Sequence, residues 1–243
     1  MNAAAAPLNL VWYVPSDQAD HYRAAGANVR PVDGDMPMKS KQLNAALRDG
    51  FDRGETVVTM DDDFVSVSRL SIVDGKHRAV KMTLVELVTE MVDLTERSGF
   101  MLGGTPGSTN PLWANPKPMS YGMVWGQMLI HLPNPVRFDE GLGMLEDLDL
   151  IIQHHKVFGG IYKDRSYMPE FHIFGRSEAG DKMYEGGYKN YRTEKLQGET
   201  LALLSMKHSE VVFEDLGLGK SVQKRVNFRQ LAKDAQTKMT GGA

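Results

Sequence analysis

Residues 56–63 read Thr-Val-Val-Thr-Met-Asp-Asp-Asp, a β-branched run that ends in three consecutive carboxylates. The Val and Thr content favours a strand over Thr56–Met60. Apolar residues recur at helical spacing before it, from Ser40 to Gly54, and the run Leu8–Val14 predicts an earlier buried strand that a turn at Pro15 closes. Strand, helix and strand in succession predict a wound α/β sheet with helices on both faces, rather than a sandwich or a bundle.

Three later segments carry helix signals. Thr83 and Glu86 make a Thr-x-x-Glu capping box ahead of an amphipathic repeat. Residues 146–155 place apolar side chains on one helical face, and a helix is also expected over 199–207. Asn227 is the expected N-cap of a last helix.

Strand material is expected at 29–32 and 161–173, and an apolar run covers 123–132. Two long loops rich in Gly interrupt the pattern, at 103–119 and 175–192. The second loop mixes glycines with tyrosines and cations. This composition suits a lid over a ligand or a stacking surface for an extruded base, and a solvated surface loop is the alternative.

Composition excludes several kinds of chemistry. The 243 residues include no Cys, which removes disulfides, thiolate zinc sites, iron–sulfur clusters and a cysteine nucleophile. With 28 Lys and Arg against 31 Asp and Glu, the net charge of −3 argues against coating nucleic acid by bulk electrostatics. Without an 18-residue apolar run or a signal peptide, we expect a cytoplasmic protein with a single domain over 1–243.

The three carboxylates lie where open α/β sheets bind ligands, at the carboxyl end of a strand. Strand alternation would put Asp61 and Asp63 on one side and Asp62 on the other. Two like charges on one side are costly unless a cation joins them, which points to Mg²⁺ or Mn²⁺ and a nucleoside diphosphate. An Asx turn without a ligand is the alternative.

A second acidic motif opens the helix expected from residue 146. The segment Gly141–Leu150 is a Gly-rich turn followed by acidic residues, among them Glu146 and Asp147. Acid in a first helical turn is stabilising through the helix dipole alone. Asp147 also flanks the apolar face at the N-terminus, where its carboxylate can point into a cleft as a general base must.

These motifs together resemble the GT-A class of glycosyltransferases, in which a strand-end Asp-x-Asp motif holds a divalent cation and the diphosphate of a nucleotide sugar. The helix Lys39–Leu47 resembles the one that precedes that motif, and Leu145-Glu146-Asp147 resembles the later Glu-Asp motif. Phage glycosyltransferases associated with TET/JBP oxygenases, which modify hydroxymethylated pyrimidines in DNA, look like the nearer relatives. The resemblance implies a GT-A-like, Rossmann-like mixed sheet, with a donor half over about 1–110 and an acceptor half over about 111–243.

The resemblance also implies roles on the donor side. Asp61 would approach the ribose of the donor, and Asp63 would ligate Mn²⁺ or Mg²⁺ with help from Asp61. Asp62 would support either role. Lys39 would lie near the donor phosphates, and Arg192, in the lid-like loop, would also approach the donor, which we expect to be a UDP-sugar.

On the acceptor side, Asp147 would deprotonate the acceptor hydroxyl if the reaction inverts the anomeric centre, and Glu146 would orient a hydroxyl. His172, on an expected strand, is the candidate histidine ligand of the metal, although a core histidine is the alternative. His208 is expected at a helix end. The adjacent pair His154-His155 cannot face one metal together.

The favoured acceptor is a 5-hydroxymethylpyrimidine in phage DNA, such as 5-hydroxymethylcytosine, which would place the enzyme in the cytoplasm of an infected bacterium. A late cluster of six cations against one acid supports a DNA acceptor, although cationic helix ends are common on surfaces; it comprises Lys220, Lys224, Arg225, Arg229, Lys233 and Lys238. The alternatives are transfer to a glycan, protein or small metabolite, a non-catalytic nucleotide-diphosphate binding module, and a nucleotidyltransferase.

Overall fold

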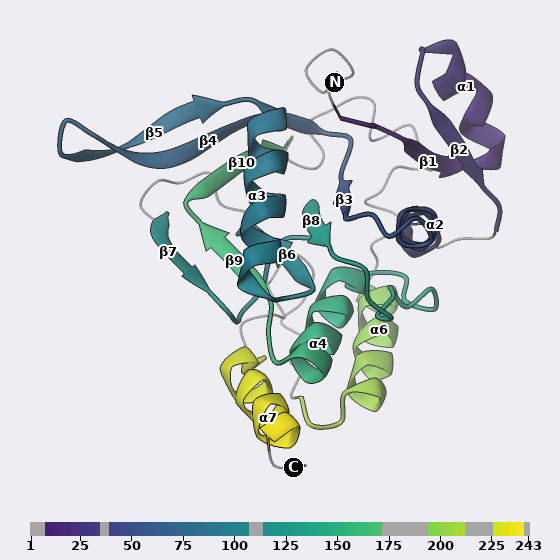
Figure 1. The fold of residues 1–243 in the computed structure, drawn as a ribbon. Coiled ribbons are helices and arrows are strands. Elements are labelled where there is room, and N and C mark those ends of the chain that lie inside the picture. Colours follow the sequence, from purple (N-terminus) through teal and green to yellow (C-terminus); the bar gives the residue numbers. More distant parts are fainter. Residues whose placement is uncertain (1–7, 35–38, 107–113, 172–193, 212–225, 241–243) are drawn as a thin grey trace.

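The computed structural model describes residues 8–34, 39–106, 114–171, 194–211 and 226–240. It is a mixed α/β fold built around a five-stranded sheet (Figure 1). The strands in spatial order are β3 (Val57–Met60), β8 (Met128–His131), β6 (Leu102–Gly104), β9 (Tyr162–Arg165) and β7 (Asn115–Met119).

Strand directions decide which ends share an edge of this sheet. β3 and β6 each pair antiparallel with β8, and β6 pairs parallel with β9. The carboxyl ends of β3, β6 and β9 therefore lie along one edge, together with the amino end of β8. Asp61 leaves β3 at this edge and donates its backbone N–H to the carbonyl of Gln127, just before β8, at 2.8 Å.

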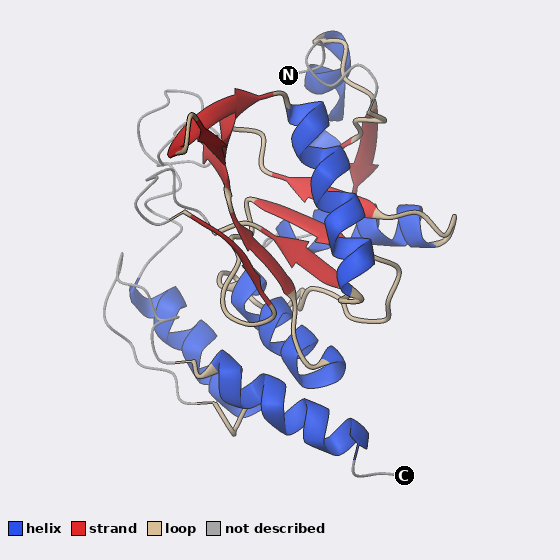
Figure 2. Cartoon of the chain, turned by 60° about the vertical axis from the view of Figure 1, so that its left-hand side comes forward, coloured by secondary structure: helices blue, strands red, loops and turns tan. Residues whose placement is uncertain are grey.

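Helices pack on both faces, as the sequence predicts. Met128 and Ile130 of β8 pack with α3 (Leu84–Ser98), while Leu129 between them faces the opposite hydrophobic cluster. Figures 1 and 2 show α3 on one side of the sheet and several helices on the other. The opposite layer comprises α2 (Lys39–Phe51), α4 (Glu146–Phe158), α6 (Glu194–Lys207) and α7 (Phe228–Thr240).

The helix boundaries follow the sequence signals closely. Thr83 and Glu86 form the expected reciprocal capping box, and Gly99 ends α3 in the left-handed conformation. The Oδ1 of Asn227 accepts the backbone N–H of Gln230 at 3.1 Å, which confirms it as the cap of α7. No described helix is both long enough and apolar enough to span a membrane.

A three-stranded antiparallel sheet lies beside the main one and was not expected from the sequence. Its order is β10 (Tyr167–Phe171), β4 (Phe64–Val73) and β5 (Lys76–Met82). Tyr167 and Val67 are buried against α3. The expected strand over 161–173 is therefore two strands, β9 and β10, which belong to different sheets and are separated at Ser166.

The expectation for the first strand needs a correction. β1 (Trp12–Pro15) does not join the five-stranded sheet; it pairs in parallel with β2 (Val29–Val32) as a separate two-stranded sheet. The turn η1 (Ser16–Gln18) and the short helix α1 (Ala19–Ala24) connect the two strands. Their shared core is small, since Val14, Ala19 and Val29 are its buried members.

Candidate active site

The candidate site forms where three elements meet at the sheet edge: the end of β3, the start of α2 and the start of α4. The Nζ of Lys39 lies 3.3 Å from the Oδ1 of Asp61 and 3.3 Å from the Oε1 of Glu146. Lys39 is the first residue of α2, and Glu146 is the first residue of α4. Three residues that the sequence separates by up to 107 positions thus form one ion cluster, whose members are all at least partly accessible.

Asp147, next to Glu146, is held by the backbone. Its Oδ1 accepts the N–H of Leu148 at 2.8 Å, and its Oδ2 accepts the N–H of Gly126 at 3.3 Å. Burial, followed by the negative charge of Glu146, raises the pKa of Asp147 to about 6, although Lys39 and both backbone donors act against the rise. A carboxylate with this pKa is ionised near neutral pH and basic enough to accept a proton.

Gly126 approaches Asp147 more closely than any larger residue could. A Cβ at this position would lie 2.8 Å from the Cβ of Asp147 and 3.0 Å from its Oδ2. The loop before β8 therefore fixes the position of the Asp147 carboxylate. Trp125, the preceding residue, is 47% exposed and donates its backbone N–H to the carbonyl of Thr105 at 3.1 Å.

Gly126 is a site residue that the sequence does not single out, and the exposed Trp125 directly precedes it. Both belong to the apolar run over 123–132, for which the sequence predicts no functional role. The available signal was the pair itself: an aromatic residue and a glycine interrupt an otherwise aliphatic stretch before β8, and a glycine within strand material often marks a close backbone approach.

The acidic cluster carries more negative charge than Lys39 alone balances. Burial raises the pKa of Asp61, and the nearby carboxylates of Glu146 and Asp62 raise it further, while Lys39 lowers it. Asp62 and Asp63 lie in the turn between β3 and β4. Asp62 is exposed. Burial raises the pKa of Tyr22 on α1, and the negative charge of Asp62 raises it further.

Backbone strain coincides with this cluster. Leu145, the N-cap of α4, has φ +60° and ψ +25°, which is the left-handed region. For a residue with a branched side chain this conformation costs on the order of 1–3 kcal/mol, and such strain gathers at functional sites. The residue with this strained backbone lies directly before Glu146, which is the first residue of α4 and contacts Lys39.

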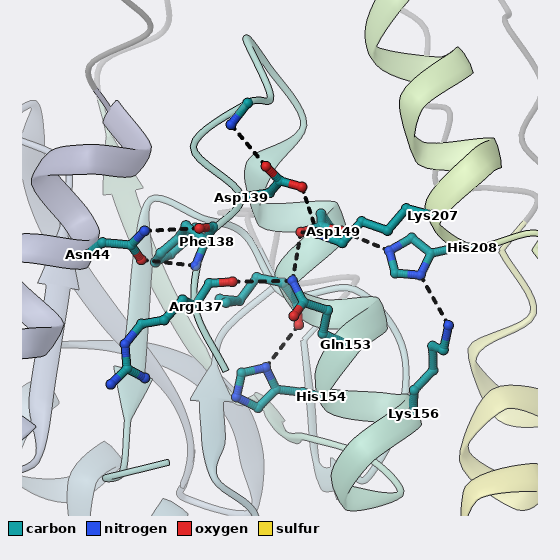
Figure 3. Close-up of polar contacts among 12 residues, drawn as sticks. Asn44, Arg137, Phe138, Asp139, Asp149, Gln153, His154, Lys156, Lys207 and His208 are labelled. Atoms are coloured by element: carbon teal, nitrogen blue, oxygen red, sulfur yellow. Dashed lines mark hydrogen bonds and ion pairs between the residues drawn. The ribbon is translucent and has the colours of Figure 1, made fainter. Parts of the chain in front are cut away.

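The opposite side of α4 is anchored by a buried polar network (Figure 3). Asp149 is fully buried, and its Oδ1 lies 2.7 Å from the Nε2 of His208. Its Oδ2 accepts from Lys207 at 2.9 Å and from Gln153 at 2.7 Å. Lys207 also reaches Asp139 at 2.8 Å, so the end of α6 ties both α4 and the loop before it.

The histidine expectations have different outcomes. His208 lies at the end of α6, as expected, although it is buried against Asp149. His154 and His155 each contact a carbonyl of their own helix through Nδ1, at 2.9 and 2.7 Å, and burial lowers the pKa of both to about 4. His172 and Arg192 lie outside the described residues, as does the lid-like loop.

Within the described ranges, no group of three or more Asp, Glu and His side chains is arranged as a metal site. Of the late cationic cluster, Arg229, Lys233 and Lys238 are described and lie exposed on α7, and the others fall outside. The sequence matches no known protein-family model, and comparisons with curated proteins and with solved structures also find no match.

Proposed function

We propose that this protein is a metal-dependent glycosyltransferase that moves a sugar from a nucleoside diphosphate sugar, with UDP-sugar as the favoured donor, to a hydroxyl group. The observation that carries the proposal is the bridge from Lys39 to both Asp61 and Glu146, with Asp147 beside it. It joins the two acidic motifs on which the resemblance to GT-A enzymes rests. A GT-A-like arrangement of the mixed α/β fold is part of the same proposal.

Each residue of the cluster has a role in the proposed reaction. Lys39 leaves its carboxylate partners for the donor phosphates, where its charge offsets the negative charge that grows as the nucleoside diphosphate departs. Asp61 approaches the ribose, and Glu146 accepts a hydrogen bond from a hydroxyl of donor or acceptor. Asp147 takes the proton of the acceptor hydroxyl in an inverting reaction, for which its pKa of about 6 is suitable.

The ligand atoms that the site offers fit Mn²⁺ or Mg²⁺. The candidate ligands that the structure describes, Asp61 and Asp63, offer carboxylate oxygens, which hard divalent cations prefer, and such ions take one or two carboxylates together with phosphate oxygens. Burial, followed by the charges of Glu146 and Asp62, raises the pKa of Asp61, and a bound cation would offset those charges. Asp61 and Asp63 would hold the ion, with His172 as a further candidate, and the bound ion would neutralise the leaving diphosphate.

The favoured acceptor is a 5-hydroxymethylpyrimidine in DNA, such as 5-hydroxymethylcytosine in phage DNA. A hydroxymethyl group offers the primary hydroxyl that Asp147 would deprotonate, and the exposed Trp125 beside the site offers a face on which a base can stack. Transfer to a glycan, a protein or a metabolite would use the same donor site.

The test is release of UDP from UDP-sugars with Mn²⁺, with and without hydroxymethylated DNA. We expect turnover in the wild type, and a loss of at least 100-fold in the variants Lys39→Met and Asp147→Asn. Asp52→Asn, an exposed carboxylate at the end of α2, is the matched control and should retain full activity. Binding of the donor without any turnover would instead indicate a nucleotide-binding module, and pyrophosphate release from a nucleoside triphosphate would indicate a nucleotidyltransferase.

A further inference from the structure

The β4–β5 hairpin extends away from the body of the protein (Figure 1). Asp74 and Gly75 form its turn with φ +52° and +71°, and two left-handed residues are typical of the tight turn whose twist matches two paired strands. β10 pairs with β4 only from Phe64 to Arg69. The distal part, from Leu70 to Ala79, is therefore two-stranded, and we call it the ribbon together with Val80 and Lys81, the next residues of the exposed edge strand β5.

This ribbon is cationic, in contrast to the net charge of −3 of the whole chain. β5 is exposed from Lys76 to Lys81, and it carries Lys76, Arg78 and Lys81. Within the part of the chain that the structure describes, none of these three cations has an acidic partner. Arg69, nearer the body, is different: it pairs with Glu90 at 2.8 Å and lies over the ring of Tyr167.

The strand register distributes the charges over both faces of the ribbon. Lys76 and Arg78 lie on one face. Lys81, opposite Ser68 at the base of the two-stranded part, lies on the other face, as does Ile72, which is 71% exposed and pairs with His77. A flat anionic surface such as a membrane would be met by one cationic face. Cations on both faces instead fit a groove with phosphates on both walls, and a two-stranded ribbon fits the major groove of duplex DNA.

The hairpin also starts at the candidate site. β4 begins directly after Asp63, and its ten residues at about 3.4 Å each span roughly 30 Å from Phe64 to Val73. This length is close to one turn of B-DNA, about 34–36 Å. We propose that the β4–β5 ribbon holds duplex DNA within about one helical turn of the nucleotide that is modified, and the position of that nucleotide rests on the proposed function.

The test is fluorescence anisotropy with an unmodified 30-base-pair duplex over a range of salt concentrations. In the triple variant Lys76→Gln, Arg78→Gln and Lys81→Gln we expect at least a tenfold weaker affinity. Three lost phosphate contacts would also lower the slope of log affinity against log salt by up to about 2.7. The single variant Arg78→Gln keeps two cations on the edge strand, which protects it against aggregation. It should show a smaller decrease in both affinity and salt slope.

The control removes the same charge elsewhere, through Arg48→Gln, Arg53→Gln and Lys195→Gln. Equal affinity and salt slope in the ribbon and control variants would overturn the inference, and so would a wild type that binds no duplex. UDP release from UDP-sugar with Mn²⁺ and hydroxymethylated DNA is measured on the wild type in parallel. If the wild type lacks that release, the proposed function fails, while a loss of DNA binding confined to the ribbon variants would still support the ribbon's role.

Discussion

Asp147 combines three properties that suit a general base. It is held by two backbone donors, it lies beside another carboxylate, and burial raises its pKa to about 6. The hydrogen bonds fix where the oxygens lie, and the raised pKa makes them better proton acceptors. Position and basicity together make Asp147 the residue on which an inverting reaction would depend.

The rate of transfer should therefore depend on the ionisation of Asp147. For an inverting enzyme kcat/KM rises with pH, because the carboxyl must lose its proton to act as a base, and it reaches half of its plateau near pH 6. Asp147→Asn should lower the rate at least 100-fold and remove this limb of the profile. Rates between pH 5 and 8 provide the check; the same limb in the residual activity of the variant would contradict the assignment.

The site residues were predictable where the motif consists of residues that are neighbours in the sequence. Three carboxylates after a strand, and an acidic pair at a helix start, identify Asp61, Glu146 and Asp147 without a structure. That Lys39 bridges the two motifs depends on how α2 packs. Gly126 could not be identified as a contact of Asp147, because its role comes from a close approach between distant segments.

Among the helices, α4 connects the candidate site with α6. Its first turn carries Glu146 and Asp147 toward the site, while Asp149 points to α6 (Figure 3). Asp149 is fully buried, and its carboxylate contacts both Lys207 and His208 at the end of α6.

Asp149→Ala should destabilise the protein by about 3–5 kcal/mol, since it leaves His208 and Gln153 without their carboxylate partner and removes one of the two carboxylates that Lys207 contacts. Equilibrium urea unfolding gives the free energy directly. The comparison is Asp234→Ala on α7, where the carboxylate is exposed and the expected change is within about 0.5 kcal/mol. Similar stability of the two variants would show that the network of Asp149 contributes little.

Elements with repeated local signals were predicted well, and elements defined by pairing were not. The capping box of α3 and the cap of α7 are short-range features, so the sequence contains them in full. The strand pairing of β1 is not local, and its separate sheet could not be inferred from an apolar run. The β4–β5 hairpin had a usable signal, Asp74-Gly75 between β-branched and basic residues, which the sequence reasoning did not use.

For the whole molecule, buried histidines make stability sensitive to acid. Burial lowers the pKa of His131 to about 3 and those of His154 and His155 to about 4, against about 6.5 in the unfolded chain. Between pH 4 and 6.5 the unfolded state therefore binds more protons, so the stability present above pH 6.5 is lost as the pH falls. Asp147, with its raised pKa, acts in the opposite sense over part of this range.

At pH 5 the three histidines account for about three extra protons in the unfolded state and Asp147 offsets about one, so the net uptake is about two. The free energy of unfolding should then fall by about 2–3 kcal/mol for each unit by which the pH is lowered near pH 5. Urea unfolding at half-unit steps between pH 4.5 and 7.5 measures this slope. A flat profile over that range would mean that the histidines are not buried in the neutral form.

The central claim is that Lys39, Asp61 and the Glu146-Asp147 pair form a metal-dependent nucleotide-sugar site. The most direct measurement is thermal stability with UDP, GDP, ADP and CDP, each with and without Mn²⁺. At 100 times its dissociation constant a ligand stabilises the fold by about 2.7 kcal/mol, or roughly 5 to 10 °C in Tm for a chain of this size. The account predicts such a shift for one diphosphate, UDP by preference, only when Mn²⁺ is present, and its loss in Asp61→Asn; no shift with any diphosphate and metal would contradict it.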